Sequence, residues 1–322
     1  MIITVTANPS LDRTIEVDRL RRGEVQRAGG NRVDAGGKGV NVSRALVANG
    51  LATRAVLSAG GHAGDELVGL LRAAAVPIVE VRVAEPIRSN LTVAEADGTV
   101  TKLNEAGPRL SEAEVEALLD ATAAATTTLA SRKSAQRAAW IAGCGSLPPG
   151  VGDDFYSRLV ERARTAGAKS AVDTSGTALE ACLAAGPDLV KPNHEELAAA
   201  AGVPITTLGD AVKAAEVLRG RGAGAVLASL GADGALLLDA TGVHHAVAAP
   251  SGHVASTVGA GDAALAGFLA VGGRGAAALR TAVAWGTAAV TLPGSRMPGP
   301  GDIDPDTVET TPYPDLDRVL SH

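Results

Sequence analysis

Aromatic residues are scarce in this sequence, and basic residues do not outnumber acidic ones. Phe, Trp and Tyr make up 2% of the 322 residues, whereas hydrophobic residues as a whole make up 46%. Ala, Val and Leu must therefore fill the core, which favours helices packed closely on a sheet. The formal net charge of −6 provides no basic field that would attract nucleic acid or an anionic membrane.

Cysteines and long hydrophobic runs are also rare. Cys144 and Cys182 lie in apolar surroundings without CxxC spacing or a nearby pair of histidines, which argues against a metal site or a disulfide framework. No stretch approaches the roughly 20 apolar residues that span a bilayer. The chain begins with a strand pattern, Ile2 to Thr6, and not with a basic segment followed by an apolar one. We therefore expect a soluble, cytoplasmic protein without a membrane partner.

Short apolar runs alternate with helical segments from about residue 138 onward. The strand-like runs are 139–142, 170–173, 188–190 and 225–228. Fully apolar strands separated by helices indicate a parallel sheet that is covered by helices on both faces. The Ala/Thr-rich run 121–130 predicts a further surface helix, and the Pro- and Gly-rich tail after Pro293 predicts a loop. We expect one doubly wound α/β domain over residues 1–322.

The first hundred residues mix a helix from Gly39 to Asn49 with strands of exposed or half-buried pattern. These strand-like stretches are 78–83, 90–96 and 100–104. Asp97-Gly98, between the last two, predicts a hairpin. We expect a small β lid, built from discontinuous segments within about 8–36 and 87–105, over the carboxyl edge of the main sheet. Its exposed edges could pair with a second subunit, so a homodimer and a monomer both stay open.

A glycine-rich run, Gly259-Ala260-Gly261-Asp262, precedes a helix-like stretch from Ala263 to Leu269. Glycines let successive N–H groups point to one centre, and a helix N-terminus adds partial positive charge. Such a nest suits the charge on a transferring phosphoryl group, and Asp262 beside it could accept a proton from the attacking hydroxyl. The alternative is that Asp262 only caps the helix. The run alone does not decide between the two interpretations.

A second glycine cluster, Ala35 to Gly39, leads into a helix with Asn41 on its first turn. It lacks the GxxxxGK[ST] spacing and is therefore not a Walker phosphate loop. An open backbone followed by an amide suits a polyhydroxylated ligand, although a tight strand-to-helix turn explains the glycines equally well. Asp12 follows the first strand, where its oxygens could accept sugar hydroxyls. A solvated loop aspartate is the alternative for Asp12.

Seven segments occur in a fixed order along the chain: TANPSLD (6–12), AGGKGVNVSRAL (35–46), GSLPPG (145–150), VDTSGTAL (172–179), KPNHEEL (191–197), SLGADGALL (229–237) and TVGAGD (257–262). Together they resemble the pfkB family of ribokinase-like carbohydrate kinases over nearly the whole chain. Two more segments, IRSN (87–90) and KLNEAG (102–107), resemble its sugar-phosphate branch. Within that branch, the similarity is greatest to 1-phosphofructokinases and tagatose-6-phosphate kinases.

The resemblance implies a ribokinase-like fold and ATP-dependent phosphorylation of a ketohexose phosphate, with fructose 1-phosphate converted to fructose 1,6-bisphosphate as the expected reaction. Asp262 would be the base, and the N–H groups of Gly259, Ala260 and Gly261 would stabilise the transferring group. Fructose 6-phosphate and tagatose 6-phosphate are alternative acceptors. A catalytically silent sugar-phosphate-binding regulator is an alternative of another class. A nicotinamide dehydrogenase is disfavoured because no GxGxxG follows the first strand.

The resemblance also implies binding roles for individual residues. The sugar phosphate would contact Asp12, Gly37, Lys38, Asn41, Arg88 and Asn90, with Arg27 as a further candidate cation. ATP would contact Lys191, Asn193, Ser229, Gly231, Thr257, Gly259, Gly261 and Ala288. The expected cofactor Mg²⁺ would be held at Glu196, directly or through water, with Glu195 as the adjacent rival. Ala263 replaces a serine that is common in the family, which removes at most one hydroxyl contact.

Overall fold

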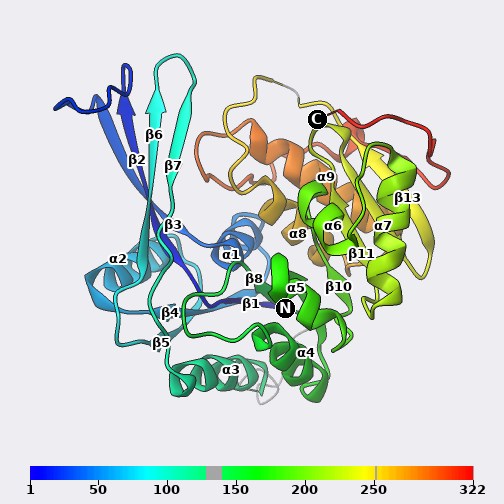
Figure 1. Cartoon of the computed structure of the whole chain (residues 1–322), viewed down its shortest axis with the longest axis horizontal. Helices are drawn as coiled ribbons and strands as arrows, with labels where there is room; N and C mark the ends of the chain where they lie inside the picture. Colours follow the sequence, from blue (N-terminus) through cyan, green and yellow to red (C-terminus); the bar gives the residue numbers. More distant parts are fainter. Residues whose placement is uncertain (128–139, 251, 322) are drawn as a thin grey trace.

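Two β-sheets, one large and one small, organise the chain (Figure 1). The computed structural model describes residues 1–127, 140–250 and 252–321. The strand order of the large sheet is β14-β13-β12-β11-β10-β9-β8-β1-β4-β5. The strands from β11 to β5 run parallel, whereas β12, β13 and β14 are antiparallel additions at one edge.

The strands of the large sheet are short and mostly buried. Their bounds are β1 Ile2–Thr6, β4 Thr53–Ala59, β5 Ile78–Arg82, β8 Trp140–Cys144, β9 Lys169–Asp173, β10 Leu189–Val190, β11 Val226–Ser229, β12 Ala235–Asp239, β13 Gly242–Val247 and β14 Glu309–Thr311. Every residue of β1 and β8 is buried, as expected for strands with helices on both faces. The carboxyl ends of the parallel strands meet at one edge of the sheet, which is where such folds bind ligands.

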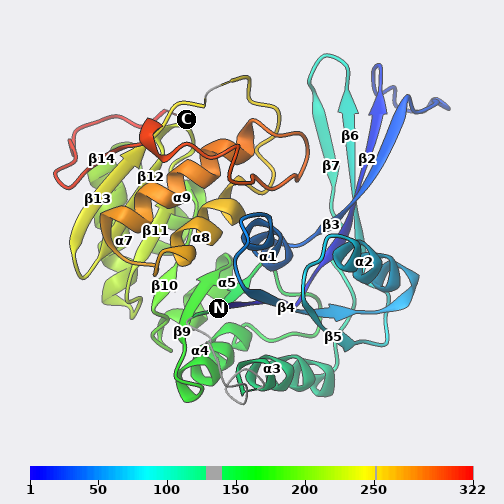
Figure 2. The ribbon, with the colours of Figure 1, turned by 180° about the vertical axis from the view of Figure 1, so that it is seen from behind.

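Helices cover both faces of the large sheet (Figures 1 and 2). One face packs against α3 Glu112–Thr127, α4 Phe155–Thr165, α5 Gly176–Leu183, α6 His194–Ala201 and α7 Leu208–Gly220. The other packs against α1 Lys38–Ala48, α8 Ala260–Ala270 and α9 Gly275–Val290. The helix α2 Gly61–Ala73 packs on β4 beside the small sheet. The predicted doubly wound α/β architecture is confirmed.

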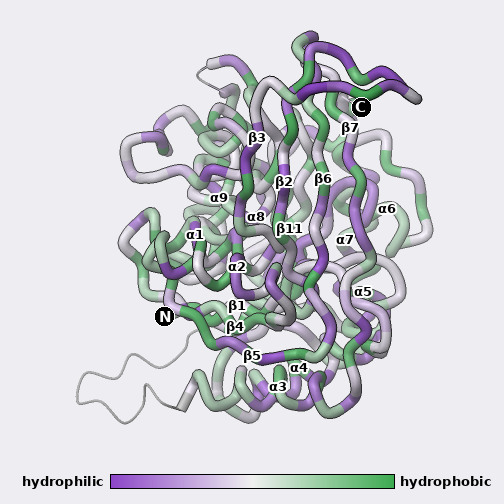
Figure 3. Tube along the Cα trace, turned by 90° about the vertical axis from the view of Figure 1, so that its left-hand side faces the viewer, coloured by the Kyte–Doolittle hydropathy of each residue, from purple (hydrophilic) through white to green (hydrophobic). Residues whose placement is uncertain are grey.

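The small sheet has the strand order β3-β2-β6-β7 and comes from the segments that the sequence assigns to a lid. Its bounds are β2 Ser10–Val17, β3 Gly30–Gly36, β6 Arg88–Glu95 and β7 Val100–Leu103. Hydrophilic residues recur along these strands (Figure 3), so the sheet is not buried on both faces. That the sheet closes over a ligand stays a prediction.

Three local expectations have clear outcomes. The predicted hairpin is confirmed, since β6 and β7 are antiparallel around Gly98, whose φ is 91°. The strand-like stretch 78–83 is β5, which belongs to the large sheet because it pairs with β4 and buries Val81 in the core. The helix predicted at 121–130 is confirmed up to Thr127, and residues 128–130 lie outside the described residues.

Within the described ranges, no helix combines the length and hydrophobicity needed to cross a membrane.

Candidate active site

Asp262 lies in the first turn of α8 and is buried, with 6% of its surface exposed. Gly259 precedes the helix at φ 81°, a left-handed conformation, and a Cβ there would lie 2.7 Å from Met297 Cε. Gly259, the N-cap residue of this helix, provides no side-chain cap, and the Ala260 N–H donates to the Thr257 carbonyl at 3.4 Å, so the helix start is otherwise open to an anion. Asp262 is not the cap. Its Oδ2 accepts a hydrogen bond from Asn41 Nδ2 at 2.9 Å, so the capping interpretation is wrong.

The environment of Asp262 tunes its basicity. Burial raises its pKa to about 6, and the negative charge of Asp173 acts in the same direction. The hydrogen bond from Asn41 and the positive charges of Lys191 and Lys38 act in the opposite direction. A general base is most effective when its pKa lies near the working pH. At pH 7 this carboxylate is mostly ionised and is still a stronger base than an exposed aspartate.

Asn41 is buried between two charged groups and not simply exposed to a ligand. Its Nδ2 donates to Asp262, and its Oδ1 accepts from Arg44 Nη1 at 3.0 Å. One amide hydrogen of Nδ2 is left for a ligand. The helix that carries Asn41 begins after Gly37, whose φ of 113° is unfavourable for any residue with a side chain. The sequence links Asn41 to sugar hydroxyls, whereas the structure places it first against Asp262.

Asp173, the last residue of β9, is fully buried and joins two lysines. Its Oδ1 lies 2.7 Å from Lys38 Nζ, and its Oδ2 lies 3.0 Å from Lys191 Nζ. Burial would raise the pKa of Asp173, but Lys191 and Lys38 outweigh burial and hold this pKa below its ordinary value. Asp173 in turn raises the pKa of Lys38, so this lysine stays a cation. Sequence reasoning missed Asp173, although a carboxylate ending an apolar strand was an available signal.

The two lysines offset the negative charges of Asp173 and Asp262 at the start of α8. A Cβ on Gly261 would lie 3.3 Å from Lys191 Nζ, so this ammonium group faces the free N–H groups of the helix. Lys38, assigned by sequence to sugar hydroxyls, points instead to Asp173 and lies 3.7 Å from Glu196 Oε1. The Lys191 ammonium group and the helix N-terminus together favour an anion such as a phosphate beside them.

Asn193 and Glu196 lie on the first turn of α6, but they bind each other. Asn193 Oδ1 accepts from the Glu196 N–H at 2.8 Å, and Glu196 Oε2 accepts from the Asn193 N–H at 2.9 Å. This is a capping box, which fixes the start of the helix. Asn193 Oδ1 and Glu196 Oε2 are therefore already engaged in holding the helix start. Glu196 Oε1 takes no part in the capping box and lies 3.7 Å from Lys38 Nζ, whereas Glu195 is exposed to solvent.

Asp12 lies on β2 opposite Asn90 on β6, and not in a solvated loop. Its Oδ1 accepts hydrogen bonds from Ser10 Oγ at 2.7 Å and from Asn90 Nδ2 at 2.9 Å. Asn90 Oδ1 and Asn8 Oδ1 are buried acceptors without a donor among the described residues. Buried polar atoms are seldom left unpaired, so this end of the small sheet suits a ligand that donates hydroxyls.

Arg88 begins β6 next to this group. Its Nη2 donates to the Asn8 carbonyl at 3.0 Å, and its Nη1 donates to the Glu105 carbonyl at 3.3 Å. Burial lowers the pKa of Arg88, while the charges of Asp12 and Glu105 act in the opposite direction. Its Nε is buried without an acceptor in the described part of the chain, which leaves one side of the guanidinium group for an anion.

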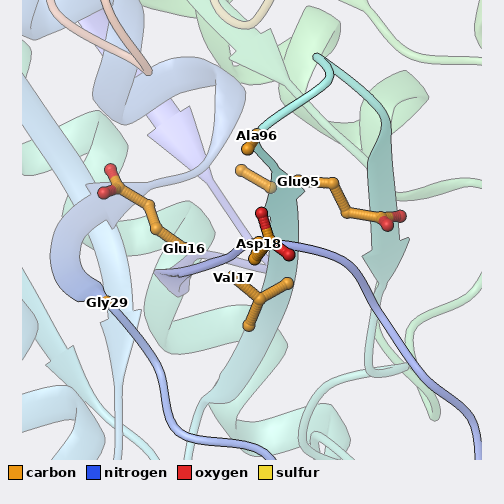
Figure 4. Close-up of a pocket in the computed structure, with 7 residues that line it drawn as sticks. Glu16, Val17, Asp18, Gly29, Glu95 and Ala96 are labelled. Atoms are coloured by element: carbon orange, nitrogen blue, oxygen red, sulfur yellow. The ribbon is translucent and has the colours of Figure 1, made fainter.

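Arg27 does not join these residues within one chain. It is exposed in the loop between β2 and β3, beyond the pair Glu16–Gly30, whereas Asp12 lies near the pair Ser10–Gly36 at the opposite end. The assignment of Arg27 to a shared site with Arg88 is therefore not supported by the fold of a single chain. A cavity of about 420 Å³ lies at this outer end and is shown in Figure 4. Its lining carries Glu16, Asp18 and Glu95, which is unsuited to a phosphate.

The remaining nucleotide candidates lie on the other side of α8. Ser229 ends β11 and pairs with Asn193 through an isolated bridge, and Gly231 follows at φ 62°. Thr257 is exposed just before α8. Ala288 is buried in α9. A Cβ on Gly267 would lie 2.8 Å from Trp285, so the small residues of α8 and α9 allow close helix packing, whatever else they do.

Comparisons with known proteins agree on one family. Residues 5–300 match the model described as "pfkB family carbohydrate kinase". A 1-phosphofructokinase of Rhodobacter capsulatus is 38% identical over 93% of each chain, and one of Haloferax volcanii is 42% identical over 94% of this chain and 95% of its own. The phosphofructokinase-2 structure from Escherichia coli has a TM-score of 0.84 at 34% identity, over 94% of this chain and 96% of that one.

Proposed function

The chain belongs to the pfkB family of carbohydrate kinases, and on this basis we propose that it phosphorylates fructose 1-phosphate to fructose 1,6-bisphosphate. It is a phosphotransferase that uses ATP and acts on an alcohol group of a fructose phosphate. The choice of fructose 1-phosphate rests on one observation. Both relatives with 38% and 42% identity over more than nine-tenths of their length are named 1-phosphofructokinase.

In this proposal Asp262 removes the proton from the free primary hydroxyl of the sugar. Its burial and its pKa of about 6 support this role, because the carboxylate is ionised at neutral pH and poorly solvated. The N–H groups of Gly259, Ala260 and Gly261 stabilise the charge on the transferring phosphoryl oxygens. Lys191 adds positive charge beside them. Closure of the small sheet excludes water, which would otherwise accept the phosphoryl group.

The nucleotide occupies the side of α8 near β11 in this proposal. Lys191, Asn193, Ser229, Gly231, Thr257 and Ala288 contact ATP. Among the described residues, no group of three or more His, Cys, Asp and Glu could hold a metal ion. A single carboxylate, that of Glu196, fits Mg²⁺ that arrives with ATP, because Mg²⁺ commonly uses one or two carboxylates, the substrate phosphates and several waters. Glu196 Oε1 would hold it, and the ion would offset phosphate charge.

The sugar phosphate occupies the inner end of the small sheet in this proposal. Asp12, Asn90, Gly37 and Asn41 contact its hydroxyls, and Arg88 grips its phosphate. The unpaired Asn90 Oδ1 and Arg88 Nε support the arrangement, because one needs a donor and the other an acceptor. A hydroxylated anion supplies both.

A screen of acceptors tests the function directly. ADP release would be measured with fructose 1-phosphate, fructose 6-phosphate, tagatose 6-phosphate and fructose. We expect kcat/KM for fructose 1-phosphate to exceed that for each other acceptor by about tenfold or more. A higher value for a 6-phosphate would identify that sugar as the substrate. Tight binding of sugar phosphate with no ADP release from any acceptor would instead support a regulator.

Fructose 6-phosphate is the second candidate acceptor. An ATP-dependent 6-phosphofructokinase isozyme 2 of Mycobacterium tuberculosis is 35% identical over 94% of this chain and 88% of its own. The phosphofructokinase-2 of Escherichia coli has been solved with fructose-6-phosphate, and its structure matches this chain at a TM-score of 0.81. The two acceptors differ in which primary hydroxyl is free, so the same screen separates them.

Replacing Arg88 with Ala is expected to raise KM for the sugar phosphate about 10- to 100-fold while kcat changes by less than about threefold. The reason is that a guanidinium group binds the existing phosphate equally in the ground and transition states. Steady-state kinetics at saturating ATP measure both constants. Arg82→Ala is the matched control, because Arg82 is exposed at the edge of the large sheet and pairs with Asp65. An unchanged KM in Arg88→Ala would place the phosphate elsewhere.

We also propose that two chains associate through the small sheet. Its edge strand β7 exposes Val100 and Leu103, which are 53% and 59% accessible. One related structure is described as the tetrameric inhibited form of phosphofructokinase-2 from Escherichia coli. Light scattering across a concentration series would reject the proposal if the mass stays that of one chain.

A cytoplasmic location is proposed as well, since Cys144 and Cys182 are buried and unpaired.

A further inference from the structure

Arg44 is a half-buried cation on α1 that no role described so far explains. Its guanidinium group forms no ion pair with a carboxylate among the described residues. Nη1 alone donates to three acceptors: the Ala35 carbonyl at 3.1 Å, Asn41 Oδ1 at 3.0 Å and Ser295 Oγ at 3.3 Å. A charged group is thus partly removed from water to hold neutral partners, which is unfavourable unless the arrangement serves something else.

The partner that matters is the Asn41 amide, because its two ends are chemically different. Asp262, when ionised, can only accept hydrogen bonds, and a guanidinium group can only donate them. With Arg44 on one side and Asp262 on the other, Oδ1 must face Arg44 and Nδ2 must face Asp262. A flipped amide would set an oxygen against the carboxylate and an NH₂ group against the cation. Both contacts would then be repulsive.

We infer that Arg44 is a positioning residue that locks the Asn41 amide in the orientation in which it donates to Asp262, and thereby holds the base ionised and aimed. This inference rests on the proposed function, since it assumes that Asp262 is the base. Arg44 touches neither the transferring phosphoryl group nor Asp262 itself. It acts through Asn41, and its positive charge adds a longer-range attraction for the carboxylate.

The other two partners of Arg44 lie in the small sheet and in the loop after α9. Ala35 lies in β3 of the small sheet, whereas Ser295 lies in the loop after α9. The guanidinium group therefore joins the inner end of the small sheet, the loop after α9 and the Asn41 amide.

The pH dependence of kcat/KM can report on this role of Arg44, and the other charged and titratable groups around Asp262 determine the direction of the change. These groups are Lys38 at the start of α1, Asp173 at the end of β9, Lys191 directly after β10 and Cys144 at the end of β8. Asp34 and Asp12 are the carboxylates whose charges act most on Arg44. Within the described residues, Arg44 forms no hydrogen bond or ion pair with Lys38, Asp173, Lys191 or Cys144. Loss of Arg44 therefore weakens the hydrogen bond from Asn41 that stabilises ionised Asp262, while the charges of Lys38 and Lys191 remain. The acid limb of the pH profile should move to higher pH.

The experiment compares wild type, Arg44→Met, Asn41→Ala and the double variant. Wild-type kinase activity is established first, so failure of the proposed function is seen before this inference is tested. For Arg44→Met we expect kcat to fall about tenfold, KM for ATP to stay unchanged, and the acid limb of kcat/KM to rise by about 0.5 to 1 in pH. Asn41→Ala should show a similar or larger shift. The double variant should shift by clearly less than the sum of the two single variants, because Arg44 acts chiefly through Asn41.

Conservative and matched controls complete the test. Arg44→Lys keeps a cationic donor and should restore the acid limb toward wild type, although one ammonium group cannot satisfy all three acceptors. Arg13→Met is the control, since Arg13 also ties the small sheet to a helix, through Glu66, and should leave the limb in place. If Arg44→Met does not fold, Arg44→Gln serves instead, and the same shift is expected. An acid limb at the wild-type position, or a pH shift that adds fully to that of Asn41→Ala, would overturn the inference.

Discussion

Replacing Asp262 with Asn is expected to lower kcat about 10³-fold while KM for ATP and for the sugar phosphate changes little. Asn keeps the shape of the side chain and can still accept the hydrogen bond from Asn41, but it cannot take a proton. Binding groups on the small sheet and around β11 are untouched. The loss should therefore appear in the chemical step alone, which single-turnover measurements of ADP formation would isolate.

The same substitution should stabilise the protein at neutral and alkaline pH. Folding raises the pKa of Asp262 from 3.8 to about 6, so the folded state keeps a proton that the unfolded chain loses as pH rises through this range. The free energy of unfolding therefore falls between these pH values, by about 3 kcal/mol for a shift of this size. Asn cannot ionise and avoids this loss. The variant should match wild type below about pH 4 and exceed its stability above pH 6.

Urea unfolding at pH 4 and pH 8 measures this difference. Asp210→Asn is a control of opposite sign, because hydrogen bonds from Thr206 and Thr207 lower the pKa of Asp210 to about 2. Asp210→Asn should therefore lose stability at neutral pH. Near-normal turnover in Asp262→Asn would remove this residue from the base role. Equal stability of Asp262→Asn and wild type at pH 8 would mean that folding does not disfavour the ionised form of Asp262.

Replacing Asp173 with Asn is expected to lower the free energy of unfolding by about 3 kcal/mol at pH 7, because it leaves two buried or half-buried lysines without their shared counterion. Lys191 is the more affected, since only 6% of its side chain is exposed. The pKa of Asp173 is depressed by folding, so its stabilising contribution is present above its unfolded pKa and is lost only as pH falls below about 4. Urea unfolding across pH measures this effect.

The Asp173→Asn variant should also move the acid limb of kcat/KM to lower pH. The charge of Asp173 helps to raise the pKa of Asp262, so its removal lets the base ionise more easily. This shift is opposite to the one expected for Arg44→Met. The double variant Asp173→Asn/Lys38→Met should recover part of the lost stability, since one unpaired lysine is then gone. An unchanged free energy of unfolding in Asp173→Asn would show that the lysines find other compensation.

Much of the fold follows from local patterns that the sequence displays. The apolar runs of β8, β9 and β11 predict buried strands, and Asp97-Gly98 predicts the turn of the hairpin between β6 and β7. For the stretch 78–83 the local pattern predicts a strand, β5, but not the sheet to which it belongs. It joins the large sheet because a sheet edge tolerates charged residues on a strand with one neighbour, and local pattern does not reveal which neighbour that is.

The features of the active site also divide into local ones, which the sequence displays, and tertiary ones, which it does not. The glycine turn before α8 and the position of Asp262 on its first turn are local features, and the sequence places both correctly. The capping box between Asn193 and Glu196 is also local, and its spacing could have been read as such. Arg27 shows the limit of this reasoning, because its distance from Asp12 depends on strand register and on the length of the ladder.

The sequence by itself therefore determined that Asp262 stands on a glycine-opened helix start in a doubly wound kinase fold, since these are properties of neighbouring residues and of apolar periodicity. Only the tertiary structure decided what surrounds that carboxylate. Asn41 and Asp262 are 221 positions apart and meet because α1 packs beside α8. Asp173 ends β9, Lys38 begins α1 and Lys191 follows β10, so three separate parts of the chain meet here. Burial and charge act through space, so the basicity of Asp262 depends on packing that no local pattern encodes.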